Sequence, residues 1–228
     1  MRTTTVLTLF LLTVFSCKSN SNKNLTVEQI WEKFTNAYGN KEKINGIRSY
    51  KATLITSQNG NSYETEFYLK GKDKLVLVYK YPDNNVTYKL NGLEGIEISQ
   101  NKKRILDDNE VLSLKTMCNL YSEIYFVNKG YKLELMGKEL INENETYKVK
   151  VIDENNEVFF YYIDTKTFYD IKLESKNGAS YFSDYKLIDG ILCSFKSRFV
   201  QNDNELMIEK RDVQFNPSIE DSFFDLKN

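Results

Sequence analysis

Two stretches of the chain place apolar residues every three or four positions, which is the spacing of one face of an α-helix. In the first stretch, Thr26 and Gln29 have the spacing of a capping box, so we predict a helix that begins after Thr26 and ends near Gly39. The second stretch begins at Asp107, whose carboxylate can cap a helix, and continues toward Gly130. The apolar positions are Val27, Ile30, Trp31, Phe34 and Tyr38 in the first helix and Val111, Leu114, Cys118, Tyr121 and Tyr125 in the second.

Most of the remaining chain alternates apolar and polar residues with a period of two, which is typical of strands with one buried face. Short turns rich in Asn, Asp and Gly separate these segments, so neighbouring strands should be antiparallel. The predicted strands cover residues 50–56, 63–70, 74–81, 86–90 and 96–99 in the first half and residues 131–136, 145–152, 158–164, 169–174, 180–187, 191–200 and 205–215 in the second.

A sheet of about eleven or twelve strands cannot stay flat, because the twist between neighbouring strands accumulates and the sheet must curl or close. No linker rich in Pro, Gly or Ser interrupts residues 25–228. We therefore predict one α+β domain over these residues, in which two main helices cover the concave face of a large curled antiparallel sheet. The space beneath the helices can be an apolar hollow or can be filled by side chains, and periodicity alone leaves both alternatives open.

The N-terminus has the pattern of a secretory signal. Arg2 precedes a run of apolar residues and threonine over residues 6–15, which is shorter than the roughly 20 residues that a membrane-spanning helix needs. The four residues that end at Cys17 resemble the lipobox of bacterial lipoproteins, in which the cysteine is acylated. We therefore expect residues 1–16 to be a lipoprotein signal peptide and residues 17–24 to be the lipidated cysteine and a polar tether. The alternative is an ordinary secretory signal with an incidental cysteine.

Composition removes several classes of function. The chain has no histidine, so Ser-His-Asp and Cys-His catalysis and histidine-containing zinc sites are excluded. Its 31 basic and 32 acidic residues give a formal net charge of −1, which does not favour nucleic-acid binding.

Few residues in the chain have the pattern of a catalytic or metal-binding site. Ser183 and Lys186 have the spacing of a serine–lysine pair but lie within one predicted strand, and the acidic residues 153–157 lack the glycine of a calcium-binding loop. We therefore expect no enzymatic activity, no cofactor and no bound metal. Cys118 and Cys193 lie on apolar faces, so we expect two buried thiols, with a disulfide between them as the alternative.

Several turn motifs along the chain resemble those of one bacterial family in their order and spacing. They are residues 44–52, 68–75, 81–83, 91–92, 137–142, 163–167, 185–190, 216–217 and 223–224. In this respect the chain is similar to the LolA/LolB-like superfamily of lipoprotein-localisation factors, and in particular to its lipid-anchored group of outer-membrane lipoprotein-sorting proteins in Bacteroidota. Each motif consists mainly of residues that are common in turns, so the likeness depends on the order and spacing of all of them together.

The resemblance implies an unclosed half-barrel of about eleven strands whose helices act as a lid over an apolar cavity for acyl chains. It also implies which side chains line that cavity. LolA members hold the lid with an arginine, whereas this chain has Gly71 and Lys72 in that neighbourhood, and an ammonium cannot reproduce the planar fork of a guanidinium. The candidate cavity residues are Phe67, Leu69, Leu75, Leu77, Val86 and Tyr88 from the strands and Trp31, Phe34, Leu114 and Tyr121 from the helices.

From this likeness we expect a lipoprotein that is anchored to the outer membrane through Cys17, and the lack of an acidic run after Cys17 favours the periplasmic side. It would bind acyl chains or lipoproteins in its cavity and serve lipid or lipoprotein traffic in the cell envelope. The alternative is an RseB-like envelope sensor that uses the same fold to bind a protein partner.

Overall fold

A computed structural model describes residues 25–100, 102–121, 130–202 and 204–227. The signal peptide, Cys17 and the tether predicted for residues 1–24 lie outside the described residues, as does Tyr125 at the end of the second predicted helix. In the part of the chain that the structure describes, no helix has the length and apolar character that a membrane span requires.

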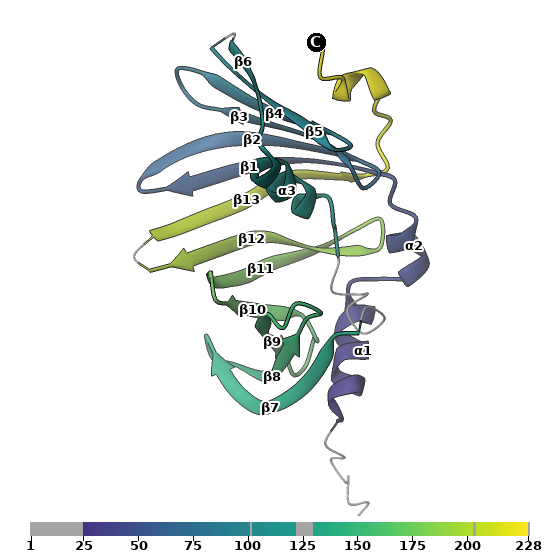
Figure 1. The fold of residues 1–228 in the computed structure, drawn as a ribbon. Coiled ribbons are helices and arrows are strands. Elements are labelled where there is room, and N and C mark those ends of the chain that lie inside the picture. The colour runs from purple at the N-terminus through teal and green to yellow at the C-terminus, as the bar shows by residue number, and fades with distance from the viewer. Residues whose placement is uncertain (1–24, 101, 122–129, 203, 228) are drawn as a thin grey trace, which may run out of the picture.

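One antiparallel sheet of 13 strands forms the body of the molecule (Figure 1). Its spatial order is β6-β5-β4-β3-β2-β1-β13-β12-β11-β10-β9-β8-β7. The strands are β1 (Ser49–Gln58), β2 (Asn61–Lys70), β3 (Lys74–Lys80), β4 (Asn85–Asn91), β5 (Glu94–Ser99), β6 (Lys102–Ile105), β7 (Lys132–Ile141), β8 (Asn144–Ile152), β9 (Val158–Asp164), β10 (Asp170–Ser175), β11 (Gly178–Ile188), β12 (Ile191–Gln201) and β13 (Asn204–Phe215).

Two meanders, β1–β6 and β7–β13, are joined by the pairing of β1 with β13. The outermost strands β6 and β7 follow each other in the sequence but lie at opposite edges, so the sheet is unclosed, as predicted. The strand count is 13 rather than about eleven or twelve, because alternation misses β6. That strand reads KKRI and is exposed throughout, so it has no buried face to produce alternation, and pairing with β5 alone defines it.

The first predicted helix is confirmed as α1 (Val27–Ala37), and both bonds of its capping box are present. The Gln29 amide donates to Thr26 Oγ1 (3.3 Å), and the Thr26 amide donates to Gln29 Oε1 (3.0 Å). The second helix, α3 (Asp108–Met117), begins after Asp107 as predicted. It stops before the predicted end, because Cys118 caps it and Tyr121 has a φ of 55°, which is incompatible with a helix. The described residues also form two short helices, α2 (Lys41–Asn45) and the 3₁₀-helix η3 (Asp221–Phe224).

The two main helices cover different parts of the sheet, so the molecule has two hydrophobic cores. In Figure 1, α3 crosses in front of β1 and β13, whereas α1 lies beside the strands at the other end of the sheet. The α3 core comprises the buried residues Tyr50, Ala52, Leu69, Leu75, Leu77, Leu90, Leu106, Val111, Leu114, Cys118, Cys193, Phe195 and Val213. The α1 core comprises Ile30, Trp31, Phe34, Tyr38, Ile44, Val149, Val151, Tyr161, Ile163, Ile191 and Leu192.

Candidate functional site

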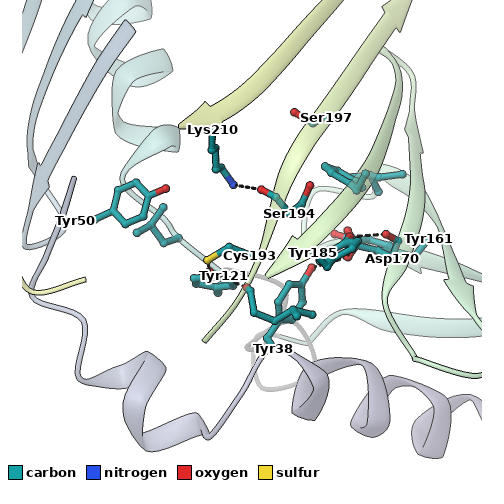
Figure 2. Close-up of a pocket in the computed structure, with 14 residues that line it drawn as sticks. Tyr38, Tyr50, Tyr121, Tyr161, Asp170, Tyr185, Cys193, Ser194, Ser197 and Lys210 are labelled. Carbon is teal, nitrogen blue, oxygen red and sulfur yellow. Dashed lines mark hydrogen bonds between the residues drawn. The ribbon is translucent and has the colours of Figure 1, made fainter. Parts of the chain in front are cut away.

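A cavity of about 250 Å³ lies where the two cores meet. Tyr50 and Cys193 in its wall belong to the α3 core, whereas Tyr38 and Tyr161 belong to the α1 core. Figure 2 shows that polar side chains from several elements converge on this space. Its apolar lining includes Leu120, Leu173, Phe182 and Leu192.

A buried carboxylate, Asp170, marks one side of the cavity and is 6% exposed. Its Oδ1 accepts hydrogen bonds from the hydroxyl groups of Tyr38 (3.1 Å) and Tyr185 (2.7 Å). Burial raises the pKa of Asp170, and the two tyrosine hydrogen bonds oppose that effect only in part. Because Tyr38 caps the C-terminal end of α1, these bonds attach that end of the helix to β10 and β11.

A thiol, Cys193, lies between the two sides of the cavity (Figure 2). The Tyr121 hydroxyl donates to the Leu192 carbonyl (3.0 Å) and is 3.2 Å from Cys193 Sγ. Burial raises the pKa of Cys193, and the contact with Tyr121 offsets this only in part, so the thiol stays protonated at neutral pH and is a poor nucleophile. Cys118 and Cys193 are both buried and free, in agreement with the prediction of two thiols.

An ammonium group and a phenol occupy the other side of the cavity. Lys210 Nζ donates to the Ser194 carbonyl (2.6 Å) and forms no ion pair with a carboxylate of the described residues. Burial lowers the pKa of Lys210, although Cys193 and Asp170 act in the opposite direction. The Tyr50 ring packs on Phe67 and Phe215, with centroids 5.6 and 5.5 Å apart. The Tyr50 hydroxyl has no hydrogen bond to any part of the chain that the structure describes, and Figure 2 shows it pointing toward the cavity.

A β-bulge explains why a lysine faces the interior. The register between β1 and β13 shifts after Thr53, so that Leu54 pairs with Lys210 instead of Arg211. Without the shift, Lys210 would point to the opposite face of the sheet, since side chains alternate along a strand. A signal was present in the sequence: Ile208 and Val213 are separated by an odd number of positions, so both can face inward only across a bulge.

The structure distributes the predicted cavity residues over the two cores. Tyr121 is the only one of them in the wall of the cavity described above. Trp31 and Phe34 are buried in the α1 core, and Leu69, Leu75, Leu77 and Leu114 are buried in the α3 core. Phe67 and Tyr88 pack against the α3 core, and Val86 is half-buried on β4. Ligand contact by these residues stays a prediction, and the polar residues Tyr38, Tyr50, Asp170 and Lys210 were not selected from the sequence.

Lys186, which has the spacing of a serine–lysine pair with Ser183, makes other contacts in the structure. Lys186 Nζ forms an ion pair with Asp184 (3.3 Å) and lies 4.2 Å from the centroid of the Phe195 ring. Among the described residues, no group of three or more Cys, Asp and Glu side chains lies close enough together to hold a metal ion.

Comparison with known proteins identifies the fold. Neither a protein-family model nor a curated protein matches the chain. A DUF1329 family protein from Desulfovibrio piger is similar in structure, with a TM-score of 0.59, 14% identity and coverage of 88% of this chain and 98% of that one. A putative outer membrane lipoprotein-sorting protein domain from Vibrio parahaemolyticus has a TM-score of 0.59 and 13% identity, with coverage of 89% of this chain and 98% of that one. A LolA superfamily protein from Nitrosomonas europaea has a TM-score of 0.55 and 12% identity, with coverage of 89% of this chain and 99% of that one. The chain therefore has a LolA-like fold.

Proposed function

We propose that this protein is an envelope lipoprotein that binds an acyl chain in the cavity between its two cores. The cavity itself carries the proposal: it has apolar walls from three strands and from the turn after α3, and each of the two helices contributes to one of the cores beside it. Apolar burial holds a hydrocarbon chain without any chemical step, at about 0.8 kcal/mol per methylene group. The LolA-like fold supports this function, because one similar structure is a putative lipoprotein-sorting protein.

The size of the cavity favours a ligand with a single chain. Ligand pockets usually enclose roughly 300–1,000 Å³, and this cavity of about 250 Å³ is slightly smaller than that range. The buried thiol with its raised pKa gives no support for an enzymatic step. Binding and release of a carried molecule is therefore the function that the site supports best.

The proposal also assigns a location. We propose that Cys17 is acylated and holds the domain at the periplasmic face of the outer membrane through the tether of residues 17–24. With a formal net charge of −1, the protein has little electrostatic attraction to anionic lipid headgroups, so the membrane association would come from the acyl anchor.

Filling the cavity tests the proposal. Ser197 lines the cavity on β12, and Ser197→Phe in the full chain with Cys17→Ala should reduce binding of a fluorescent fatty-acid probe roughly tenfold or more, since the ring occupies the space of the chain. Ser183→Phe is the matched control, because Ser183 is exposed on the neighbouring strand β11 and lies outside this cavity.

Two results would contradict acyl-chain binding in this cavity. The first is a folded Ser197→Phe protein that binds the probe as tightly as its parent. The second is a parent protein that binds no probe and shows no copurified lipid by native mass spectrometry. Capture of a periplasmic protein by the same lipid-free chain would instead favour the alternative of an envelope sensor.

A further inference from the structure

We infer that the acyl ligand of this cavity carries a carboxylate, which binds between Lys210 Nζ and the Tyr50 hydroxyl. The inference rests on the proposed acyl-chain binding and adds the headgroup. It assigns the ligand to the class of long-chain fatty acids in their ionised form. The two donors come from different strands, β13 and β1, and face the same space in Figure 2.

The first argument is that this side of the cavity has hydrogen-bond donors in excess. A lysine ammonium has three N–H donors, and Lys210 uses one of them on the Ser194 carbonyl. The Tyr50 hydroxyl donates to no described residue, although the side chain as a whole is only 7% exposed. Donors that are partly desolvated and unpaired are costly, so they select a ligand that brings acceptors.

The second argument is that a carboxylate oxygen and a carbonyl oxygen in the cavity wall already accept hydrogen bonds from the protein. Asp170 Oδ1 receives the hydroxyl groups of Tyr38 and Tyr185. The Leu192 carbonyl receives the Tyr121 hydroxyl. A ligand headgroup with donors, such as a protonated amine, would therefore compete with tyrosine hydroxyls for these acceptors and would be repelled by Lys210.

The third argument distinguishes a carboxylate from a phosphate. Both are anions that bind an ammonium group through charge-assisted hydrogen bonds. A carboxylate presents two oxygens, which match the ammonium of Lys210 and the hydroxyl of Tyr50. A phosphate monoester carries close to one further negative charge at neutral pH, and Lys210 is the only cationic side chain among the described residues that line this cavity, so that charge would be buried without a cation. The apolar residues Leu173 and Phe182 can then contact the hydrocarbon chain of the ligand.

Three ligands with the same chain test the headgroup. Dodecanoate, 1-dodecanol and dodecyl phosphate are titrated by calorimetry into the full chain with Cys17→Ala at neutral pH, below the micellar concentrations of the two anions and the solubility limit of the alcohol. We expect dodecanoate to bind roughly tenfold or more tightly than 1-dodecanol and more tightly than dodecyl phosphate, because an ionic hydrogen bond adds to the same apolar burial.

Variants at Lys210 assign the preference to this side chain. Lys210→Met keeps the length of the apolar stem and should abolish the preference for dodecanoate while 1-dodecanol still binds. Lys210→Arg should restore most of the preference. Lys196→Met is the matched control, because Lys196 is exposed on the adjacent strand β12 and lies outside this cavity. Tyr50→Phe removes only the hydroxyl and should reduce the preference by a smaller factor.

The outcomes separate this inference from the function on which it rests. Equal binding of dodecanoate and 1-dodecanol by the parent protein overturns the carboxylate site and leaves acyl-chain binding intact. Tighter binding of dodecyl phosphate overturns it in favour of a phosphate headgroup. If Lys210→Met does not fold, the ratio of the dodecanoate and 1-dodecanol affinities of the parent protein still shows whether the cavity prefers a carboxylate. Failure of all three ligands to bind overturns the proposed function together with the inference.

Discussion

The two helices on this sheet are attached in different ways. α1 buries three large side chains almost completely: Ile30 is 0%, Trp31 3% and Phe34 1% exposed. The Trp31 ring lies 4.9 Å from that of Phe34 and 5.1 Å from that of Tyr161, in edge-to-face geometry. Such pairs add to the apolar burial of the rings. α1 is therefore a fixed part of the hydrophobic core.

α3 is anchored by fewer apolar groups. It buries Val111 and Leu114, whereas Leu112 is 61% and Met117 is 43% exposed. A partly exposed ion-pair cluster adds to this attachment, since Arg104 on β6 pairs with Glu110 of α3 (2.7 Å) and with Glu97 of β5 (2.5 Å).

Ion pairs of this kind stabilise a protein only a little, so most of the attachment of α3 comes from two side chains. The cavity wall includes Tyr38, which caps the tightly packed helix α1, and Tyr121, which follows the loosely packed helix α3. We therefore expect α3 to detach at a lower free energy than α1 and to admit the ligand.

The largest effect should come from the core of the tightly packed helix. Phe34→Ala should lower the free energy of unfolding by about 3–5 kcal/mol, because it removes a fully buried ring and leaves a hole. Leu114→Ala in α3 should lower it by about 2 kcal/mol, at the lower end for a buried leucine, because α3 can shift toward the hole. Urea denaturation followed by circular dichroism measures both values. An equal or greater loss for Leu114→Ala would break the distinction between the helices.

A smaller, pH-dependent effect should come from Asp170, where α1 is attached to the strands beside the cavity. Its pKa in the folded protein is raised above 3.8 by burial, so the folded state holds the proton more tightly than the unfolded state. The free energy of unfolding contributed by Asp170 therefore falls as the pH rises from about 3.8 through the raised pKa. Asp170→Asn lacks this contribution, so its stability relative to the parent should increase with pH over that interval.

Asp164 on β9 provides the control for this titration. Burial tends to raise its pKa, but hydrogen bonds from Thr167 and from the Lys166 amide outweigh burial and lower it. Asp164→Asn should therefore become less stable relative to the parent as the pH rises, the opposite of Asp170→Asn. Denaturation curves across the acidic range test both. A difference between Asp170→Asn and its parent that does not vary with pH would show that Asp170 is not desolvated.

The smallest effect should come from the ion pairs on α3. Glu110→Gln keeps a side-chain acceptor for the Asp107 amide but removes the charge that Arg104 binds. Native-state hydrogen exchange should show faster opening of the α3 amides, by less than about fivefold, with no change in α1.

The pH dependence of hydrogen exchange in the parent protein is a second test of these ion pairs. Hydrogen bonds from Arg104 lower the pKa of Glu110 to about 2, so the protection that this pair gives α3 is present above its ordinary value of 4.5 and is lost as the pH falls toward 2. If Glu110→Gln accelerates exchange in α1 as strongly as in α3, the two helices open as one unit and the comparison fails.

Local spacing determined the elements of this protein. The capping box at Thr26 and the carboxylate of Asp107 fixed where both helices begin, because a cap is completed within one turn of the helix. Alternation identified strands whose sides differ in burial, and short turns made them antiparallel. The same rule missed β6, whose residues are all exposed, and the helical spacing continued past Cys118, where backbone geometry ends α3.

The candidate site was decided by the tertiary structure. Tyr38, Tyr50, Asp170, Cys193 and Lys210 come from separate parts of the chain, and only the pairing of β1 with β13 and the packing of α1 on β8 to β12 bring them together. A single bulge turned Lys210 inward, and the excess of donors exists because other side chains occupy the nearby acceptors. Burial and hydrogen bonding depend on neighbours distant in the sequence, whereas periodicity records only which face of an element is apolar.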